Sequence, residues 1–409
     1  MRVLIITAYY SPDGGPAAPL FTMLCEGLAK RGHEVTALTA VPHYPTGIIP
    51  PTFRTRKVRT TLENGVRVIR VPLPSVDRSK LAPRLFQFLA FQISSAIAGL
   101  KLDCDAFITH SPALEVWLPF FAQARMKHKP AIYSVHDVYP GVGIRLGIFT
   151  HRAVIRGVSA LEKFCLMSAR RIRVLSKSFR MELIESGVPD SRIELIYDWV
   201  DLGKIKPLSR ANSLLAEFDL SGKFVLLYAG NFGLVQGLES VLDAAQMLLK
   251  EPEIVFVFIG DGAGRTGLVE KVQRLGLENV RFFPYQPRER MPEVFSLADV
   301  CLVTLKKGAG YGALPSKTYS IMASGRPVLA SLDPGCDAWD LIERSGGGLC
   351  VPPESPDALA QAILQLKGDE EGRKRYGVNG RQYVEKFHSA EYASEAFERL
   401  LLEVVDHRN

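Results

Sequence analysis

Short, strongly apolar runs alternate along this chain with stretches whose apolar residues recur at helical spacing. A clear example is PLFTMLCEGLAKRGH (19–33), which follows the first apolar run and has Gly32 at its end as a helix cap. Strands that are apolar throughout are buried on both faces, and helices between them supply the cover. The alternation therefore predicts an α/β protein with parallel, doubly wound sheets.

The alternation occurs twice, before and after a polar segment (204–223) that lacks a clean period. The strands predicted before it are 2–10, 34–40, 66–73, 105–111, 131–137, 171–176 and 193–197; those after it are 224–230, 254–260, 280–285, 299–305, 326–331 and 348–352. The 409 residues also exceed the ~100–200 residues of a usual single domain. We predict two Rossmann-like domains, 1–203 and 204–387, that face a cleft, and a C-terminal helix (388–409) that packs back on the first domain.

Glycine-rich loops follow the first strand of each predicted domain, at the edge where open α/β sheets bind ligands. The loop SPDGGPAAP (11–19) contains Gly14 and Gly15, and backbone N–H groups at the following helix start can hold phosphate. It does not match G-x-G-x-x-G, and a plain tight turn is the alternative. The loop AGNFGLVQGL (229–238) offers Asn231 and Gln236 as its side chains able to hydrogen-bond strongly.

Two later segments repeat this pattern. In IGDGAG (259–264), Asp261 is interpreted as a turn or cap residue rather than a catalyst. In GALPSKTYSIMASGRPVLAS (312–331) there is no Asp or Glu, but Lys317 stands between Pro315 and a short helix. We expect Lys317 to point into the cleft as part of an anion-binding corner, although lysines in such clusters are usually solvated.

Charge and cysteine content limit the classes of partner. Lys and Arg (50) exceed Asp and Glu (43) by 7, which favours an anionic ligand or membrane surface and requires no nucleic acid; solubility alone is the alternative. The six cysteines show no C-x-x-C spacing, so no zinc or redox site is predicted and a reduced, cytoplasmic protein fits best.

The segment 78–101 raises the question of membrane contact. It is apolar but interrupted by Gln87, Gln92, Ser94 and Ser95, and it falls short of the ~18 uninterrupted apolar residues of a spanning helix. Its ends are basic. We therefore predict an amphipathic helix that either packs on the core or touches anionic lipid at the membrane surface.

The order of these motifs resembles glycosyltransferase family 4, which has the two-domain GT-B fold, and within it the WbuB-like branch of O-antigen and capsule sugar transferases. The motifs are YYSPDGGPAAP (9–19), HDVYPG (136–141), YAGNFGLVQGLE (228–239), FIGDG (258–262) and PSKTYSIMASGRPVLAS (315–331). The resemblance implies a retaining, metal-independent transferase without a cofactor. It would move a sugar from a nucleotide-diphosphate donor, UDP-sugar for preference, to a polyprenyl-diphosphate-linked or related glycan acceptor at the cytoplasmic face of the inner membrane.

The resemblance also implies roles for individual residues. His136, at the end of a predicted strand, would contact the donor sugar, with a purely structural histidine as the alternative. Asp137 would orient that ring, bind a hydroxyl or act as a base. Lys317 would stabilise the departing diphosphate. The other residues assigned to donor binding are Gly14, Gly15, Asn231, Phe232, Gln236, Gly260, Asp261, Gly262, Pro284, Tyr285, Tyr311, Ser316, Thr318 and Ser320.

This chain departs from the family where charged residues are usual. Many members carry a glutamate pair that aligns here with Gly312 and Ser320, and a basic pair that aligns with Asn231 and Gln236. Each charge-assisted hydrogen bond lost would weaken diphosphate binding by roughly 1.5–3 kcal/mol. Lys317 is interpreted as replacing the missing charge.

Two other functions stay open at this point. The missing glutamates are also compatible with a non-catalytic subunit that binds a nucleotide sugar and supports a partner transferase. A nucleotide-sugar 2-epimerase shares the fold, but it needs acid and base groups in the cleft, and His136, Asp137 and Asp261 are the candidates available.

Overall fold

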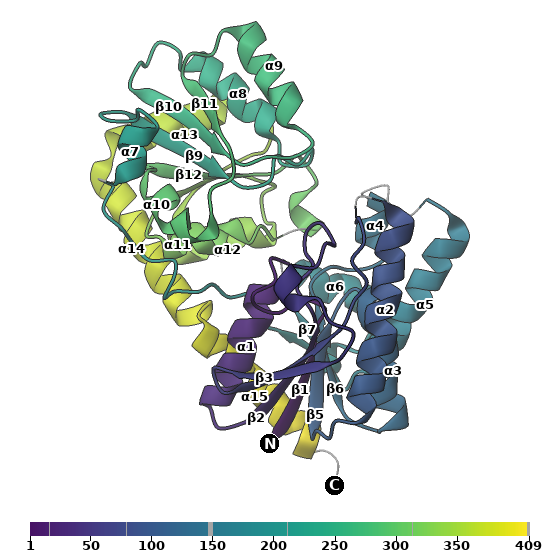
Figure 1. Ribbon diagram of the computed structural model, residues 1–409. Helices are drawn as coiled ribbons and strands as arrows, with labels where there is room; N and C mark the ends of the chain where they lie inside the picture. The colour runs from purple at the N-terminus through teal and green to yellow at the C-terminus, as the bar shows by residue number, and fades with distance from the viewer. Residues whose placement is uncertain (16, 79, 146–149, 211, 313, 407–409) are drawn as a thin grey trace. The chain divides into compact units, whose positions relative to one another are not determined.

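A computed structural model describes residues 1–409 except 16, 79, 146–149, 211, 313 and 407–409. The chain forms two compact units (Figure 1). The first comprises residues 1–198 and 390–409, and the second comprises residues 199–389. The division thus falls before the polar segment 204–223, and the final helix belongs to the first unit.

The described strands of the first unit form an eight-stranded sheet in the order β3-β4-β2-β1-β5-β6-β7-β8. The strands are β1 (Arg2–Ile6), β2 (Glu34–Ala40), β3 (Arg59–Glu63), β4 (Val66–Val71), β5 (Ala106–His110), β6 (Ala131–Val135), β7 (Arg171–Val174) and β8 (Ile193–Leu195). The helices are α1 (Ala18–Lys30), α2 (Leu81–Leu100), α3 (Ala113–Phe121) with a π-helical continuation (Ala122–Met126), α4 (Gly141–Arg145), α5 (Arg152–Ser168), α6 (Lys177–Glu185) and α15 (Ala390–Asp406).

Neighbouring strands in this sheet are parallel except for β3, which pairs antiparallel with β4. Strand β3 was not predicted from the sequence. Its residues, RTTLE, contain no apolar run, and Leu62 is 78% exposed, because β3 lies at the sheet edge and has no core to face. Of the strands that were predicted, β5 and β6 have every residue buried.

Helix α15 packs against α1. Its buried face carries Phe397, Leu401 and Val404, which gives it an apolar side at helical spacing. Glu398 of α15 accepts a hydrogen bond from Arg31 and lies 2.8 Å, through Oε1, from Nε2 of His33. The chain therefore returns to the first unit after building the second.

The described strands of the second unit form a parallel six-stranded sheet in the order β11-β10-β9-β12-β13-β14. The strands are β9 (Phe224–Ala229), β10 (Ile254–Ile259), β11 (Val280–Phe283), β12 (Val300–Thr304), β13 (Val328–Ser331) and β14 (Gly348–Val351). The helices are α7 (Ser213–Glu217), α8 (Leu238–Met247), α9 (Arg265–Leu275), α10 (Met291–Ser296), α11 (Lys317–Ala323), α12 (Asp337–Ser345), α13 (Pro356–Gly368) and α14 (Glu370–Phe387).

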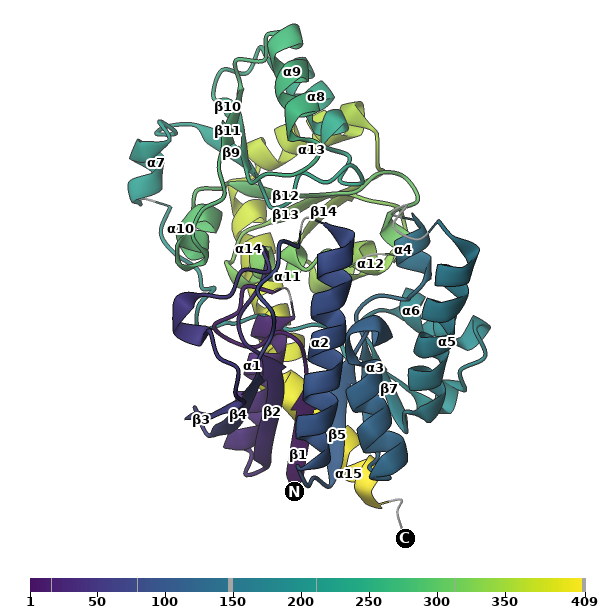
Figure 2. The same cartoon turned by 45° about the vertical axis from the view of Figure 1, so that its right-hand side comes forward.

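Both faces of this sheet are covered. Alternate residues of β10 enter two separate cores, so that Val255 and Val257 pack with α10, α11 and α12, whereas Phe256 and Phe258 pack with α8 and α13. Figure 2 shows the two groups of helices on opposite sides of the strands. The doubly wound α/β fold predicted from the alternating runs is confirmed.

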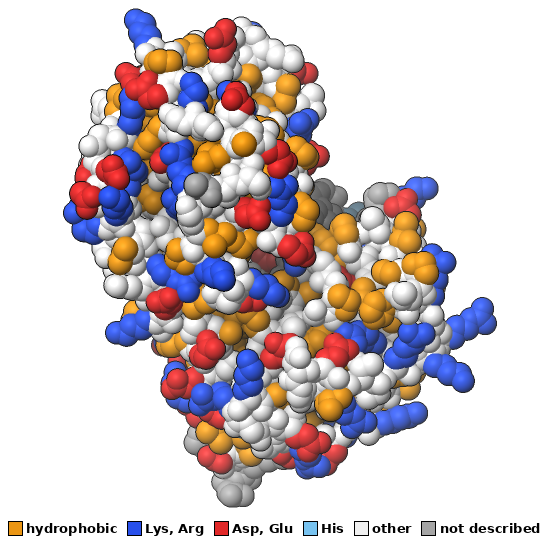
Figure 3. Space-filling view, turned by 60° about the vertical axis from the view of Figure 1, so that its left-hand side comes forward, with side chains coloured by type: hydrophobic (Ala, Val, Ile, Leu, Met, Phe, Trp, Pro, Cys, Tyr) orange, Lys and Arg blue, Asp and Glu red, His pale blue; other side chains and the backbone are white. Residues whose placement is uncertain are grey.

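Three further properties bear on possible partners: the distribution of surface charge, the apolarity of the helices and the state of the cysteines. On the face shown in Figure 3, Lys and Arg side chains are interspersed with Asp and Glu. Among the described residues, none of the helices is long and apolar enough to cross a bilayer. All six cysteines are unpaired, and five of them are buried.

Candidate functional site

A polar corner surrounds Lys317, the first residue of α11. Its ammonium nitrogen lies 3.7 Å from the centroid of the Tyr228 ring and 3.5 Å from Oε1 of Gln236. The Tyr228 hydroxyl lies 2.9 Å from the same Oε1 atom and 2.8 Å from the carbonyl oxygen of Asn231. Strand β9, the loop that follows it and α11 therefore meet at the carboxyl edge of the second sheet.

The surroundings of Lys317 lower the pKa of its amine. Burial lowers the pKa of Lys317 to about 7, because the ammonium group loses hydrating water. A ring face and an amide oxygen compensate only in part, and no described carboxylate lies within ion-pair distance of Lys317. An incoming phosphate would favour the charged amine, so this corner suits an anion.

Two glycines allow neighbouring loops to lie against this corner. A Cβ on Gly260 would lie 1.9 Å from the carbonyl oxygen of Gly230, and a Cβ on Gly262 would lie 2.4 Å from Oδ1 of Asn231. Their φ values are 150° and 153°, which other residues rarely adopt. Glycine is required here because the loops after β9 and β10 touch through their backbones.

Asp261, between these glycines, has a structural role. Its Oδ1 accepts the N–H of Gly262 at 2.8 Å, and its carbonyl oxygen accepts the N–H of Phe232 at 2.8 Å. The Tyr285 hydroxyl donates to that same carbonyl oxygen at 3.2 Å, and the ring of Tyr285 is exposed beside Pro284. Asp261 thus holds the loop, as a turn residue would, and leaves the Tyr285 ring accessible to a ligand.

The remaining predicted residues of this unit are divided. The Phe232 ring is fully buried against Phe258 and Phe282. The ring therefore cannot contact a donor, and only the backbone of Phe232 is available for such a contact. Thr318 is fully buried with its hydroxyl unpaired, one position after Lys317. Ser316 and Tyr311 are exposed, Ser320 is half-buried, and the Tyr311 hydroxyl donates to the carbonyl oxygen of Pro334.

A buried carboxylate that the sequence analysis missed shapes the loop before α11. Asp333, after β13, accepts the N–H of Gly308 at 2.9 Å and that of Gly310 at 3.0 Å. It thereby fixes the segment that leads to Gly312 and Lys317. No local sequence signal could identify it, because the loop it holds precedes it by more than twenty residues.

In the first unit, Asp13 occupies the centre of the predicted glycine loop. Its buried carboxylate accepts the N–H of Gly15 at 2.8 Å through Oδ1 and the N–H of His43 at 2.8 Å through Oδ2. A Cβ on Gly15 would lie 2.6 Å from the Tyr9 ring. The N–H of Gly15 is therefore already used within the protein, and the assignment of Gly15 to donor binding stays a prediction. Gly14 is adjacent and half-buried.

His136 directly follows β6 and is half-buried. Its Nε2 lies 3.3 Å from Oγ of Ser134, and its Nδ1 lies 3.9 Å from Oδ1 of Asp198. Loss of hydrating water around the ring lowers the pKa of His136 to about 3, so the ring is neutral at physiological pH. Such a ring can accept or donate a hydrogen bond but carries no positive charge.

The charged groups around His136 are fixed from other strands. Arg173 of β7 is fully buried, and its Nη2 donates to Oδ1 of Asp198 at 2.6 Å. The backbone N–H groups of His136 and Asp137 both donate to Oγ of Ser111, and the Asp137 side chain is exposed. Arg173 and Asp198 were not predicted from the sequence, because the pair forms only after β6, β7 and β8 align.

A second buried acid lies at the same sheet edge. Glu115, in the first turn of α3, accepts a hydrogen bond from the Tyr9 hydroxyl at 3.2 Å, and Arg78 Nη2 donates to that hydroxyl at 3.2 Å. Burial raises the pKa of Glu115 to about 7. This edge therefore combines a neutral histidine with a carboxyl group that titrates near neutrality.

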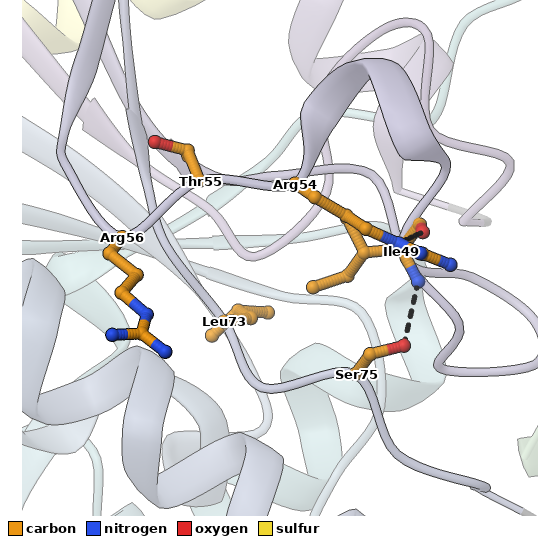
Figure 4. A pocket seen from close by; sticks show the side chains of 6 residues that line it. All are labelled: Ile49, Arg54, Thr55, Arg56, Leu73 and Ser75. Atoms are coloured by element: carbon orange, nitrogen blue, oxygen red, sulfur yellow. Dashed lines mark hydrogen bonds between the residues drawn. The ribbon is translucent and has the colours of Figure 1, made fainter.

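A separate surface pocket of about 430 Å³ lies in the first unit (Figure 4). The N–H of Ile49 donates to Oγ of Ser75 across it, and Arg54 Nε donates to the carbonyl oxygen of Ile49. Its lining residues are Ile49, Arg54, Thr55, Arg56, Leu73 and Ser75. None of the predicted site residues lines this pocket.

Within the described residues, no group of three or more His, Cys, Asp or Glu side chains could hold a metal ion.

Two family models match the chain, one in each half. The family described as "Glycosyl transferase 4-like domain" matches residues 15–199, and the family described as "Glycosyl transferases group 1" matches residues 216–383. WbjE of Pseudomonas aeruginosa, named as a probable glycosyltransferase, is 33% identical over 376 residues and covers 89% of each chain. WcaI of Escherichia coli, named "Putative colanic acid biosynthesis glycosyl transferase", is 28% identical over 89% of this chain and 92% of its own length.

Solved structures show the same fold at low identity. Sucrose-phosphate synthase from Thermosynechococcus elongatus aligns with a TM-score of 0.72 and 21% identity over 99% of each chain. Anabaena HepE in complex with UDP-glucose aligns with a TM-score of 0.72 and 16% identity over 98% of this chain and 100% of that one. These likenesses establish the fold alone.

Proposed function

This chain belongs to the glycosyltransferases of family 4, which have the GT-B fold, and we propose that it transfers a sugar from a nucleotide-diphosphate donor with retention at the anomeric carbon. The observation that carries the proposal is the position of Lys317. Its amine lies at the carboxyl edge of the second sheet, next to glycine loops and without a carboxylate partner among the described residues. An arriving diphosphate would complete this site.

The proposed chemistry needs positive potential where the leaving group gains charge. As the bond between the anomeric carbon of the donor sugar and the diphosphate breaks, negative charge develops on the diphosphate. A preorganised cation stabilises this charge. Lys317 supplies this cation without a metal ion. The departing phosphate takes the proton of the acceptor hydroxyl, so the mechanism requires no glutamate at Gly312 or Ser320.

We assign the donor to the second unit, with UDP as the preferred nucleotide, since HepE has been solved with UDP-glucose. The acceptor is a lipid-linked glycan of surface polysaccharide synthesis, in line with the name of WcaI, and is assigned to the first unit. His136 is uncharged and would hydrogen-bond a sugar hydroxyl. The enzyme would work at the cytoplasmic face of the membrane.

The test is release of nucleotide from a panel of UDP- and GDP-sugars by the purified chain, with membrane extract as the source of acceptor. A thermal-shift screen against the same donors identifies the nucleotide, because ligand at 100 times its dissociation constant stabilises the folded protein by ~2.7 kcal/mol. Release of a nucleotide together with a glycosylated lipid supports the proposal. Binding without release, under all donors, contradicts it.

A non-catalytic subunit is the second candidate, favoured by Gly312 and Ser320 at the positions where the family resemblance implies a glutamate pair. Such a subunit would bind a nucleotide sugar at Lys317 and leave turnover to a partner. It differs in one result: loss of the Lys317 amine would leave the partner's transfer rate unchanged.

A further inference from the structure

Helix α2 exposes a continuous apolar face. Its exposed large side chains are between 38% and 58% accessible, and they are Leu85, Phe86, Leu89, Ile93, Ile97 and Leu100. At 3.6 residues per turn they fall within an arc of roughly 120°. Every other exposed position of α2 that the structure describes is Ala82 or Arg84. The outward face is thus apolar along the length of the helix.

The inward face of α2 carries the polar residues. Gln87 is 1% exposed and donates to the carbonyl oxygens of Gly47 and Pro74. Gln92 donates to the carbonyl oxygen of Leu114 at 2.9 Å, and its Oε1 accepts the N–H of Leu118 at 3.0 Å. These glutamines attach α2 to the first unit by hydrogen bonds.

Phe91 also packs inward, but the longer apolar stripe of α2 faces outward, whereas an ordinary surface helix turns its apolar stripe to the core. The exposed side chains of α2 therefore cannot be explained as a core-facing stripe. Contiguous exposed apolar patches mark sites where a protein meets another apolar surface. Core packing and contact with anionic lipid were both compatible with the sequence of this helix, and the burial pattern favours contact with lipid.

The charges at the ends of α2 indicate which kind of apolar surface its exposed face meets. The 20 residues of α2 include no Asp or Glu, and Lys80, Arg84 and Lys101 are exposed at its two ends. A second copy laid antiparallel on this face would bring the basic ends together, which like charges oppose. An anionic lipid headgroup layer is complementary, since it attracts the ends while the acyl region accepts the apolar face.

We propose that the exposed face of α2 lies in the headgroup region of a bilayer that contains anionic lipid. The helix is about 30 Å long and would lie along the surface without crossing it. At its start, Arg78 lies 5.3 Å from the Phe88 ring and donates to the Tyr9 hydroxyl. The docked helix therefore begins beside the residues at the carboxyl edge of the first sheet. The inference rests on the proposed function in that a bilayer is where a lipid-linked acceptor resides.

The test is co-sedimentation of the full chain with vesicles of phosphatidylcholine, with and without phosphatidylglycerol, in the absence of donor and acceptor. The wild type should bind the anionic vesicles, and added salt should weaken binding. Leu89→Glu with Ile93→Glu should lower binding by about tenfold or more, because carboxylates on the inserted face are costly to bury. Lys80→Glu with Arg84→Glu should abolish the preference for phosphatidylglycerol.

A matched control is Leu402→Glu on α15, which is 45% exposed, as Ile93 is. It should bind vesicles as the wild type does, and all variants should unfold at the wild-type temperature because the changed side chains are exposed. Wild-type protein that ignores both vesicles, or Leu89→Glu with Ile93→Glu that binds them equally, overturns the proposal. So does a dimer in solution that this double variant dissociates, which would assign the face to a second copy. Because no sugar is present, failure here is distinct from failure to release nucleotide.

Discussion

The ammonium nitrogen of Lys317 lies 3.7 Å above the centroid of the Tyr228 ring, at the junction of β9, its glycine loop and α11. The amine loses part of its hydrating water here and has no carboxylate partner among the described residues. The lysine amine and the tyrosine ring are each ordinary groups. Together they form a site in which the charge of the amine depends on the ligand that binds beside it.

The first prediction concerns pH. In the free protein, burial lowers the pKa of Lys317 to about 7, so a growing fraction of the amine is neutral above that value. A bound diphosphate raises this pKa, so the complex takes up a proton and the Kd for UDP rises with pH by up to about tenfold per unit. Calorimetry between pH 7 and 9 measures this, since the terminal phosphate (pKa about 6) is already ionised there.

The matched variant for this prediction is Lys317→Arg, whose guanidinium stays charged throughout the range. Its Kd for UDP should be nearly independent of pH, even if it differs in size from that of the wild type. A wild-type Kd that stays constant from pH 7 to 9 would rule out a titrating amine in the nucleotide site.

The second prediction concerns the contact between the loops after β9 and β10. Gly260→Ala would place a Cβ 1.9 Å from the carbonyl oxygen of Gly230 at a φ of 150°. We expect a loss of about 1–3 kcal/mol in stability and weaker UDP binding, because backbone must move. Gly267→Ala in α9 is the control, since nothing lies within 4 Å of its Cβ and alanine favours helix. Equal melting temperatures for the two variants would contradict the packing described.

The third prediction concerns Glu162, a buried carboxyl of α5 that accepts hydrogen bonds from the N–H of Ala113 and the Tyr133 hydroxyl. Burial raises the pKa of Glu162 to about 7, above its ordinary value of 4.5. The folded state thus holds a proton that the unfolded state releases, and stability falls as pH rises from about 4.5 to 7. Glu162→Gln removes this ionisation and should be more stable than the wild type at pH 8, by about 1–3 kcal/mol. A variant that melts below the wild type at pH 8 would contradict this.

The fold could be predicted from the sequence because buried parallel strands leave continuous apolar runs between helical periods. The edge strand β3 could not, since Leu62 and its neighbours face solvent. For α2, the sequence predicted an amphipathic helix with basic ends but not its orientation. That orientation depends on carbonyl oxygens of Gly47 and Pro74, which leave no mark in a residue pattern.

The candidate site was predicted in part. Lys317 and the glycine loops are visible in the sequence because Gly and Lys have few structural substitutes in such positions. Its partner Tyr228 was missed, since their contact depends on the order in which β9, β12 and β13 assemble. Phe232 was assigned to donor binding; its ring fills the core behind the loop, so its backbone is the part that could contact a donor.

The most direct test of Lys317 as the cation at the leaving group is the rate of nucleotide release by Lys317→Ala, measured with the sugar donor that the wild type uses and with membrane extract as acceptor. Loss of one preorganised cation at the leaving group should reduce turnover by about 10²–10³-fold. Lys307→Ala, which removes an exposed lysine from the preceding loop, should keep the wild-type rate. A folded Lys317→Ala protein that releases nucleotide as fast as the wild type would contradict the account.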